Sequence, residues 1–213
     1  MREEEVVVLS EGKVCATFKK GEHIFTQGDT PKGIFIINLG KVLIARLADN
    51  GNEQVIKMAN SGDIIGYRAL LSNEIYSSTA TAIETTDVCF LPRHLFFSYL
   101  EHNVTIAGAL LKIASEDLKK SERKIVDLNQ KSAKERIAEA LLYIKEIYGV
   151  ESDGATLSAT LSRGDIANIA GTTRETSIRV LAELHHKGII DFIGKSIRIC
   201  DFQSLVTLAN VSE

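Results

Sequence analysis

Three charged residues near the middle of the C-terminal third have the chemistry needed to read DNA bases. Arg174, Glu175 and Arg179 follow the turn-forming residue Gly171. A guanidinium can donate two hydrogen bonds to the O6 and N7 atoms of guanine, and a carboxylate can accept one from the N4 amine of cytosine. This combination indicates sequence-specific contact with base edges, provided that a helix holds the three side chains outward.

The segment 161–188 predicts a helix-turn-helix that would present these residues. A first helix has an apolar face, Gly171 supplies the turn, and Thr172 or Thr173 can cap a second helix. The residues expected to face the core are Ile166, Ile169 and Ala170 in the first helix, and Ile178, Leu181 and Leu184 in the second. Arg174, Glu175, Ser177 and Arg179 then occupy the exposed N-terminal end of a recognition helix. The alternative is a helical hairpin inside a larger core, with a face that is only solvated.

The residues that follow favour the DNA-binding interpretation. Residues 188–199 alternate as two short strands around a turn at Gly194 and Lys195. A short hairpin directly after a helix-turn-helix is typical of the wing of a winged helix. We therefore expect double-stranded DNA as a partner.

Composition restricts where such a partner could bind. The chain has 213 residues, 45% of them hydrophobic, and a net charge of −3, so a DNA-binding surface has to be local. No apolar run approaches membrane-spanning length, and the acidic start at Glu3, Glu4 and Glu5 is unlike a signal peptide. We expect a cytoplasmic protein without a membrane partner. We find no catalytic triad, metal-ligand cluster or phosphate loop, and we therefore predict no enzyme activity and no metal site.

The cysteines are few and scattered. Cys15, Cys89 and Cys200 are odd in number and lack paired spacing, which argues against a disulfide framework or a zinc site. Three thiols also fall short of the four that iron–sulfur clusters usually require. We expect each cysteine to be a small hydrophobic residue at a strand position.

The first hundred residues predict short strands separated by glycine-containing turns. The evenly spaced strands suggest a jelly roll or a related barrel, followed by a helix that begins near Arg93 after Pro92. The strands are expected near Glu22–Thr26, Gly33–Asn38, Lys41–Leu47, Glu53–Ala59, Ser77–Ala82 and Thr86–Leu91.

A long helix then carries a row of small and apolar residues at alternating four- and three-residue steps, the spacing of a coiled coil. This row, called the seam below, comprises Ala107, Leu111, Ala114, Leu118, Ser121, Ile125 and Leu128. We expect the seam to pair two copies of the chain in parallel, while Ile106, Leu110 and Ile113 pack on the strand domain. The alternative is an amphipathic helix that lies on its own domain. Asn129–Ser132 break the pattern and predict a hinge before a helix at Ala133–Tyr148.

The predicted fold is α+β with three parts: a β-roll at residues 1–101, a dimerisation helix at 102–129, and a winged helix-turn-helix at 130–213. This order of parts resembles the cyclic-AMP receptor protein/FNR (CRP/FNR) family of bacterial transcription regulators. The resemblance covers nearly the whole chain. Its motifs are Gln27-Gly28-Asp29, Gly40, Gly62-Asp63-Ile64-Ile65-Gly66, and Gly171 through Arg179.

The resemblance assigns roles to residues of the C-terminal part. Arg174, Glu175 and Arg179 match the base-reading positions of the cyclic-AMP receptor branch, whereas the FNR branch differs at the first of them. The residues assigned to the DNA backbone are Arg163, Thr173, Thr176 and the wing residue Lys195, and we group Ser177 with them. The resemblance implies a homodimer on an inverted repeat with TGTGA-like half-sites, and contact with RNA polymerase.

The effector pocket is where the chain departs from the family pattern. That pattern places a glutamate on the ribose and an arginine on the cyclic phosphate, but this chain has Tyr67 and Ser77 at those positions. Glu122 would add repulsion, and a buried phosphate without its arginine would lack a counter-charge. If Gly66-Tyr67-Arg68 is a strand, Arg68 points away from Tyr67 and cannot replace the missing arginine. We therefore do not expect cyclic AMP to be the effector.

Two roles for the β-roll remain open. It could bind another small molecule in a pocket formed by Gly66, Tyr67, Arg68, Ser77, Ser78, Thr79, Ser121 and Glu122, or it could be a structural platform in a constitutive DNA binder. Ser121, the polar break in the seam, fits an effector contact but could equally set the helix register. A haem sensor is a third idea, for which we find no ligand spacing.

The hypothesis is a homodimeric transcription regulator with an unknown effector. Its two recognition helices would enter successive major grooves about 34 Å apart. An effector would rotate the winged-helix domains about the Asn129–Ser132 hinge. The competing hypothesis is a signalling module that binds a cyclic nucleotide and uses its winged helix for protein contacts.

Overall fold

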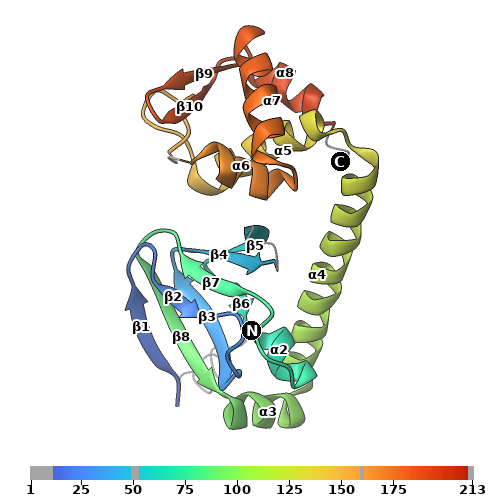
Figure 1. Cartoon of the computed structure of the whole chain (residues 1–213). Helices are drawn as coiled ribbons and strands as arrows, with labels where there is room; N and C mark the ends of the chain where they lie inside the picture. Colours follow the sequence, from blue (N-terminus) through green and yellow to red (C-terminus); the bar gives the residue numbers. More distant parts are fainter. Residues whose placement is uncertain (1–11, 49–52, 159–160, 211–213) are drawn as a thin grey trace. The chain divides into compact units, whose positions relative to one another are not determined.

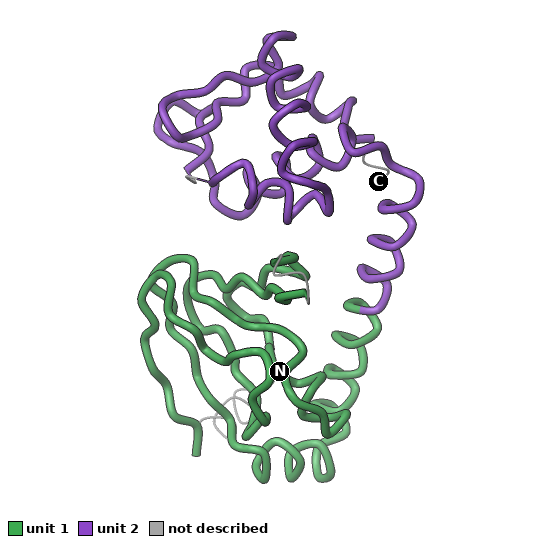
Figure 2. Tube along the Cα trace, in the orientation of Figure 1, with its two compact units in different colours: residues 1–117 green, residues 118–213 purple. Residues whose placement is uncertain are grey.

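The computed structural model describes residues 12–48, 53–158 and 161–210, which form two compact units (Figure 2). The first unit comprises residues 1–117 and the second residues 118–213, so the boundary falls within the long helix α4 (Val104–Gln130). The division into segments 1–101, 102–129 and 130–213 stays a prediction.

Eight strands of the first unit form two antiparallel four-stranded sheets (Figure 1). The strands are β1 (Val14–Phe18), β2 (His23–Phe25), β3 (Gly33–Leu39), β4 (Lys41–Leu47), β5 (Glu53–Asn60), β6 (Ile64–Ile65), β7 (Thr79–Ala82) and β8 (Thr86–Pro92). Their orders are β1-β8-β3-β6 and β2-β7-β4-β5. Both sheets contribute to one core, in which Ile37 and Val88 of the first sheet pack with Val42 and Ala80 of the second. Two facing sheets of this kind confirm the expected jelly roll.

The six predicted strands are all present, with the bounds of β4 predicted to the residue. The sequence analysis missed β1, β6, the helix α2 (Tyr67–Ser72) and the C-terminal helix α8 (Phe202–Ala209). These elements are short or, like β1, have mostly exposed side chains, so they carry little hydrophobic periodicity.

Cys15 and Cys89 lie in strands as expected, but the expectation that the cysteines form no disulfide was wrong. Cys15 of β1 and Cys89 of β8 are register partners, and their sulfur atoms form a disulfide. The two residues are 74 positions apart in the sequence, so no local spacing could reveal the pair. Cys200 is free and exposed rather than buried.

Helices close one end of the β-roll. The helix α3 (Arg93–His102) begins after Pro92, as expected. Phe96 of α3, Leu70 of α2 and Leu110 of α4 share a buried cluster, against which Ile113 packs. This confirms that the side of α4 carrying Leu110 and Ile113 covers the strand domain.

The second unit is a winged helix. Its elements after α4 are α5 (Ala133–Tyr148), α6 (Arg163–Ala170), α7 (Arg174–His186), β9 (Ile190–Ile193), β10 (Ser196–Ile199) and α8. Ile137 and Leu141 of α5 are fully buried with Ile166 of α6, Leu181 of α7 and Leu205 of α8. The predicted helix Ala133–Tyr148 and the wing strands are confirmed.

Candidate nucleic-acid interface

Polar caps and one glycine define the helix-turn-helix. The Ser162 hydroxyl accepts a hydrogen bond from the Asp165 N–H at 3.1 Å, and the Asp165 carboxylate accepts one from the Ser162 N–H at 2.7 Å. This capping box begins α6. Gly171 ends α6 with φ at +61°, a left-handed conformation that favours glycine. Thr173 caps α7 by accepting from the Thr176 N–H at 3.2 Å.

The predicted base-reading residues lie on the first turns of α7. Arg174, Glu175 and Arg179 are all exposed. None of their side chains makes a hydrogen bond or ion pair with another residue that the structure describes. The two guanidinium groups and the carboxylate therefore keep their full hydrogen-bonding capacity for an external partner.

Leu181 and Leu184 of α7 are buried as predicted, but the prediction for Ile178 was wrong. Ser177 is fully buried together with Val180, Leu181 and Leu184, whereas Ile178 is 48% exposed. Ser177 therefore cannot contact the DNA backbone from this position. Its hydroxyl has no hydrogen-bond partner among the described residues.

Arg163 and Lys195, near the wing, differ in burial: Arg163 is partly buried and Lys195 is exposed. Arg163, predicted to contact the DNA backbone, places its guanidinium carbon 4.2 Å from the ring centre of Phe192 in β9, a cation–π contact. Partial burial lowers the pKa of Arg163. Lys195, at the turn between β9 and β10, is exposed, and so is the cap residue Thr173.

An ionic network ties α7 to α5. The Lys134 ammonium of α5 bonds to the Glu183 carboxylate of α7, which also pairs with Lys187 at 3.1 Å. Hydrogen bonds from both lysines lower the pKa of Glu183 and, in return, the pKa of Lys187 is raised by its bond to Glu183. The sequence analysis did not single out this network.

Comparison with known proteins identifies the family. The chain is 30% identical over 192 residues to Electron transport regulator A of Shewanella oneidensis, covering 90% of this chain and 76% of that protein. It is equally similar, over 192 residues, to the transcriptional activator protein FnrA of Stutzerimonas stutzeri, of which it covers 78%. The chain belongs to the CRP/FNR family of transcription regulators. Residues 15–103 match the cyclic nucleotide-binding domain family, and residues 135–208 match the Crp-like helix-turn-helix domain.

The fold of this CRP/FNR protein agrees with a solved structure. A CRP/FNR-family transcriptional regulator from Thermus thermophilus superposes with a TM-score of 0.81 at 24% identity, covering 94% of this chain and all of that one. CRP/FNR proteins are transcription regulators and not enzymes, and they bind DNA through the helix-turn-helix domain. Within the described ranges, no helix has both the length and the apolar composition to cross a bilayer.

The predicted effector pocket of the CRP/FNR protein has a different geometry from the one expected. Gly66 has φ at +83° and starts the helix α2, so Tyr67 is the first helical residue and is not in a strand. The Tyr67 hydroxyl donates to the Asp117 carboxylate of α4 at 2.8 Å, and the Lys57 ammonium of β5 pairs with the same carboxylate oxygen at 2.5 Å. Burial and then the bond to Asp117 raise the pKa of Tyr67. The tyrosine is therefore committed to a contact within the protein.

The strand on which the expected direction of Arg68 depended is absent, because α2 is helical. The Arg68 guanidinium donates to the Ser77 hydroxyl and lies 3.6 Å from the Glu74 carboxylate. The Thr79 hydroxyl accepts from the Gln27 N–H at 3.1 Å. The structure thus brings Arg68 and Ser77 together. Ser121 and Glu122 are exposed residues of the second unit, and their place in the pocket stays a prediction.

The sequence analysis did not identify Lys57 and Asp117. Asp117 lies seven residues after Leu110 and four after Ile113, on the side of α4 that packs on the β-roll. This spacing could have indicated that Asp117 faces the β-roll. Lys57 is brought close only by the sheet, so nothing local indicates its role.

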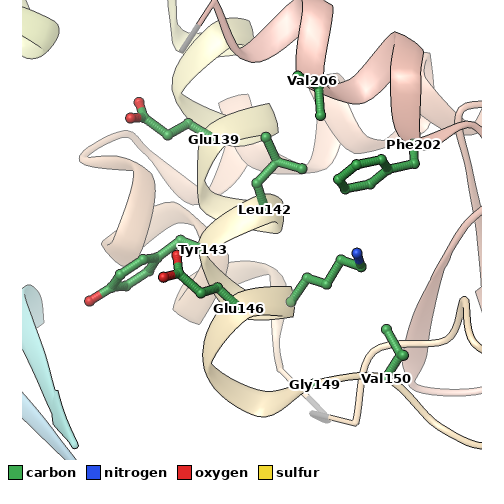
Figure 3. Close-up of a pocket in the computed structure, with 9 residues that line it drawn as sticks. Glu139, Leu142, Tyr143, Glu146, Gly149, Val150, Phe202 and Val206 are labelled. Atoms are coloured by element: carbon green, nitrogen blue, oxygen red, sulfur yellow. The ribbon is translucent and has the colours of Figure 1, made fainter. Parts of the chain in front are cut away.

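A cavity of about 600 Å³ lies in the winged-helix unit, between α5 and α8 (Figure 3). Leu142 and Glu146 of α5 line it with Phe202 and Val206 of α8. The Lys145 ammonium lies 4.1 Å from the centre of the Phe202 ring. The cavity contains none of the residues predicted for the effector pocket. Among the described side chains, no group of three or more His, Cys, Asp or Glu residues could hold a metal ion.

Proposed function

We propose that the protein is a homodimer that binds an inverted repeat with TGTGA-like half-sites. The observation that supports this most is the exposed Arg174–Glu175–Arg179 surface on the first turns of a capped recognition helix. The arginines would bind guanine O6 and N7, and the glutamate would accept from cytosine N4. Thr173, Thr176, Arg163 and Lys195 would bind phosphates and fix the helix in the groove.

The proposed dimer forms along the seam of α4. Leu111, Leu118 and Ile125 are 69%, 62% and 61% exposed. Three large apolar side chains at heptad spacing on one helix are expected to bury against a second copy. A two-fold dimer also matches the symmetry of an inverted repeat.

The proposed regulator does not respond to cyclic AMP. Tyr67 is bound to Asp117 and is not the carboxylate that a ribose would need, and the Glu74 carboxylate beside Arg68 would repel a cyclic phosphate. These contacts are compatible with a β-roll that binds another small molecule and with one that binds no effector. The alternative of a nucleotide-binding signalling module lacks support, because it gives no role to the exposed base-reading residues.

A gel-shift series tests the proposal. The wild-type chain should bind a TGTGA palindrome more tightly than a scrambled duplex, with and without cyclic AMP. Arg179→Ala should cost about 1–3 kcal/mol on the palindrome and relax the discrimination. Lys195→Ala is the matched control: it should weaken both duplexes equally and reduce the salt slope by about one.

Two results would contradict the proposal. Equal binding of wild-type protein to both duplexes would exclude base recognition by this helix. The absence of DNA binding under every effector condition would favour the signalling module.

A further inference from the structure

One side chain of α5 joins the end of the long helix to the turn of the helix-turn-helix. Nη1 of Arg136 donates to the carbonyl oxygens of Lys131 at 2.7 Å and Leu128 at 3.4 Å. Its Nε donates to the Ala170 carbonyl at 3.0 Å, and its Nη2 donates to the Gly171 carbonyl at 3.3 Å. These four acceptors lie where α4 and α6 end, and the last carbonyls of a helix have no intrahelical partner.

The chemistry of these contacts favours arginine. The guanidinium presents five N–H donors in a planar fork, so one group can satisfy acceptors from two chain segments in a fixed geometry. Its positive charge also lies at the negative ends of two helix dipoles. A lysine would keep the charge but could not span four carbonyls.

Packing brings the same two segments together independently of Arg136. A Cβ atom added at Gly171 would lie 2.8 Å from Cδ2 of Leu128, so the turn contacts the last turns of α4 directly. Lys131, which follows α4, has a side chain only 7% exposed, and it pairs with Glu139 at 2.9 Å and Asp127 at 3.6 Å. The segment predicted as a hinge is therefore held from several sides.

We propose that Arg136 is a positioning residue that sets the spacing of the DNA half-sites this protein prefers. The inference rests on the proposed function. Thr173 caps the recognition helix two residues after Gly171, so fixing the turn fixes the start of α7. In a dimer paired along α4, the direction of α7 relative to α4 decides how far apart the two recognition helices lie. The Asn129–Ser132 segment is then a rigid connection between α4, along which the dimer pairs, and the recognition helix α7.

Binding to palindromes of different spacing tests this role. One base pair moves a half-site by about 3.4 Å, so spacers that are one or two base pairs longer or shorter probe the geometry directly. The wild-type protein should prefer one spacing by at least about tenfold, and Arg136→Gln should reduce this preference to within about threefold. Arg136→Lys should also lose the spacing preference. It replaces Arg136→Gln in this test if the glutamine variant does not fold.

The matched control is Lys145→Gln, which removes a positive charge from the same helix. It removes the contact with the Phe202 ring of α8 but takes no part in the Arg136 contacts or in the Lys134–Glu183 network, so the spacing preference should survive. A loss of stability alone would lower the active fraction on every duplex and leave the ratio between spacings unchanged.

A distance measurement without DNA separates failure of this inference from failure of the proposed function. Spin labels at Lys120→Cys in α4 and His186→Cys in α7, in a Cys200→Ser full chain diluted with unlabelled protein, report this connection directly. The distance distribution should be narrow with Arg136 and broad in Arg136→Gln. An unchanged distribution, or an Arg136→Gln protein with wild-type spacing preference, would overturn the inference even if DNA binding is confirmed.

Discussion

The side chains of α7 divide between two faces with different chemistry. Arg174, Glu175 and Arg179 face solvent, while Val180 and Leu181 are fully buried. Ser177 lies on the buried face, and its hydroxyl has no partner among the described residues. A buried hydroxyl without a hydrogen bond costs about 1–3 kcal/mol in desolvation, so this serine lowers the stability of the recognition helix.

Ser177→Ala should therefore stabilise the protein. We expect a gain of about 1 kcal/mol, or about 2–4 °C in Tm by calorimetry. Ser162→Ala is the matched control, because it removes the hydroxyl that caps α6 and should destabilise the protein by about 1 kcal/mol. Equal losses in the two variants would mean that Ser177 has a hydrogen-bond partner.

Asp153 lies in the loop before the helix-turn-helix. Its carboxylate accepts hydrogen bonds from the Thr156 hydroxyl at 2.6 Å, the Thr156 N–H at 2.8 Å and the Ala155 N–H at 3.0 Å. These bonds lower the pKa of Asp153 to about 2 from 3.8. Because the folded pKa is below the unfolded one, the stabilisation is complete above about pH 4 and is lost as pH falls toward 2.

Asp153→Asn should consequently lower Tm at neutral pH, and the difference from wild type should shrink between about pH 4 and about pH 2. Circular dichroism melts over this range measure it. A difference in Tm that stays constant down to the acid end of the range would contradict the assignment.

At the scale of elements, the long helix α4 serves two surfaces. Leu110, Ile113 and Asp117 face the β-roll, and the seam leaves Leu118 and Ile125 exposed. The sequence predicted that Leu110 and Ile113 pack on the β-roll, because a long helix repeats its pattern often enough to be read from the sequence, whereas the pairing of two copies along the seam stays a prediction.

Leu118→Glu should break the proposed dimer. Burying a leucine contributes about 1.5–3 kcal/mol, and the two-fold axis would also bring two carboxylates together. Sedimentation should give a species near 23.4 kDa for this variant and twice that mass for wild type. Lys119→Glu, one position away from the seam, should remain dimeric. A wild-type monomer would exclude the seam as a dimer interface.

Short or partly polar elements limited what the sequence could predict. Gly66 is followed by only six helical residues, too few for a helical period, so the direction of Arg68 was considered only for a strand. Ser177 was taken to be exposed because serine is polar, although the core of α7 requires that position to be buried. The carbonyl contacts of Arg136 depend on how three helices meet, which no local pattern records.

The whole molecule carries little net charge, so its binding to DNA has to depend on local contacts. A net charge of −3 gives little general attraction to DNA, so specific contacts must contribute a large share of the selectivity. The central claim is that two copies of the Arg174–Glu175–Arg179 surface contact one duplex.

The most direct test is selection from a random DNA library by the purified full-length protein. We expect recovery of one inverted repeat, with G·C pairs in each half-site and half-site centres about 10–10.5 base pairs apart. Replacing Arg179 with alanine should erase the preference at one symmetric pair of positions. Enrichment of unrelated sequences, or of a motif without two-fold symmetry, would contradict it.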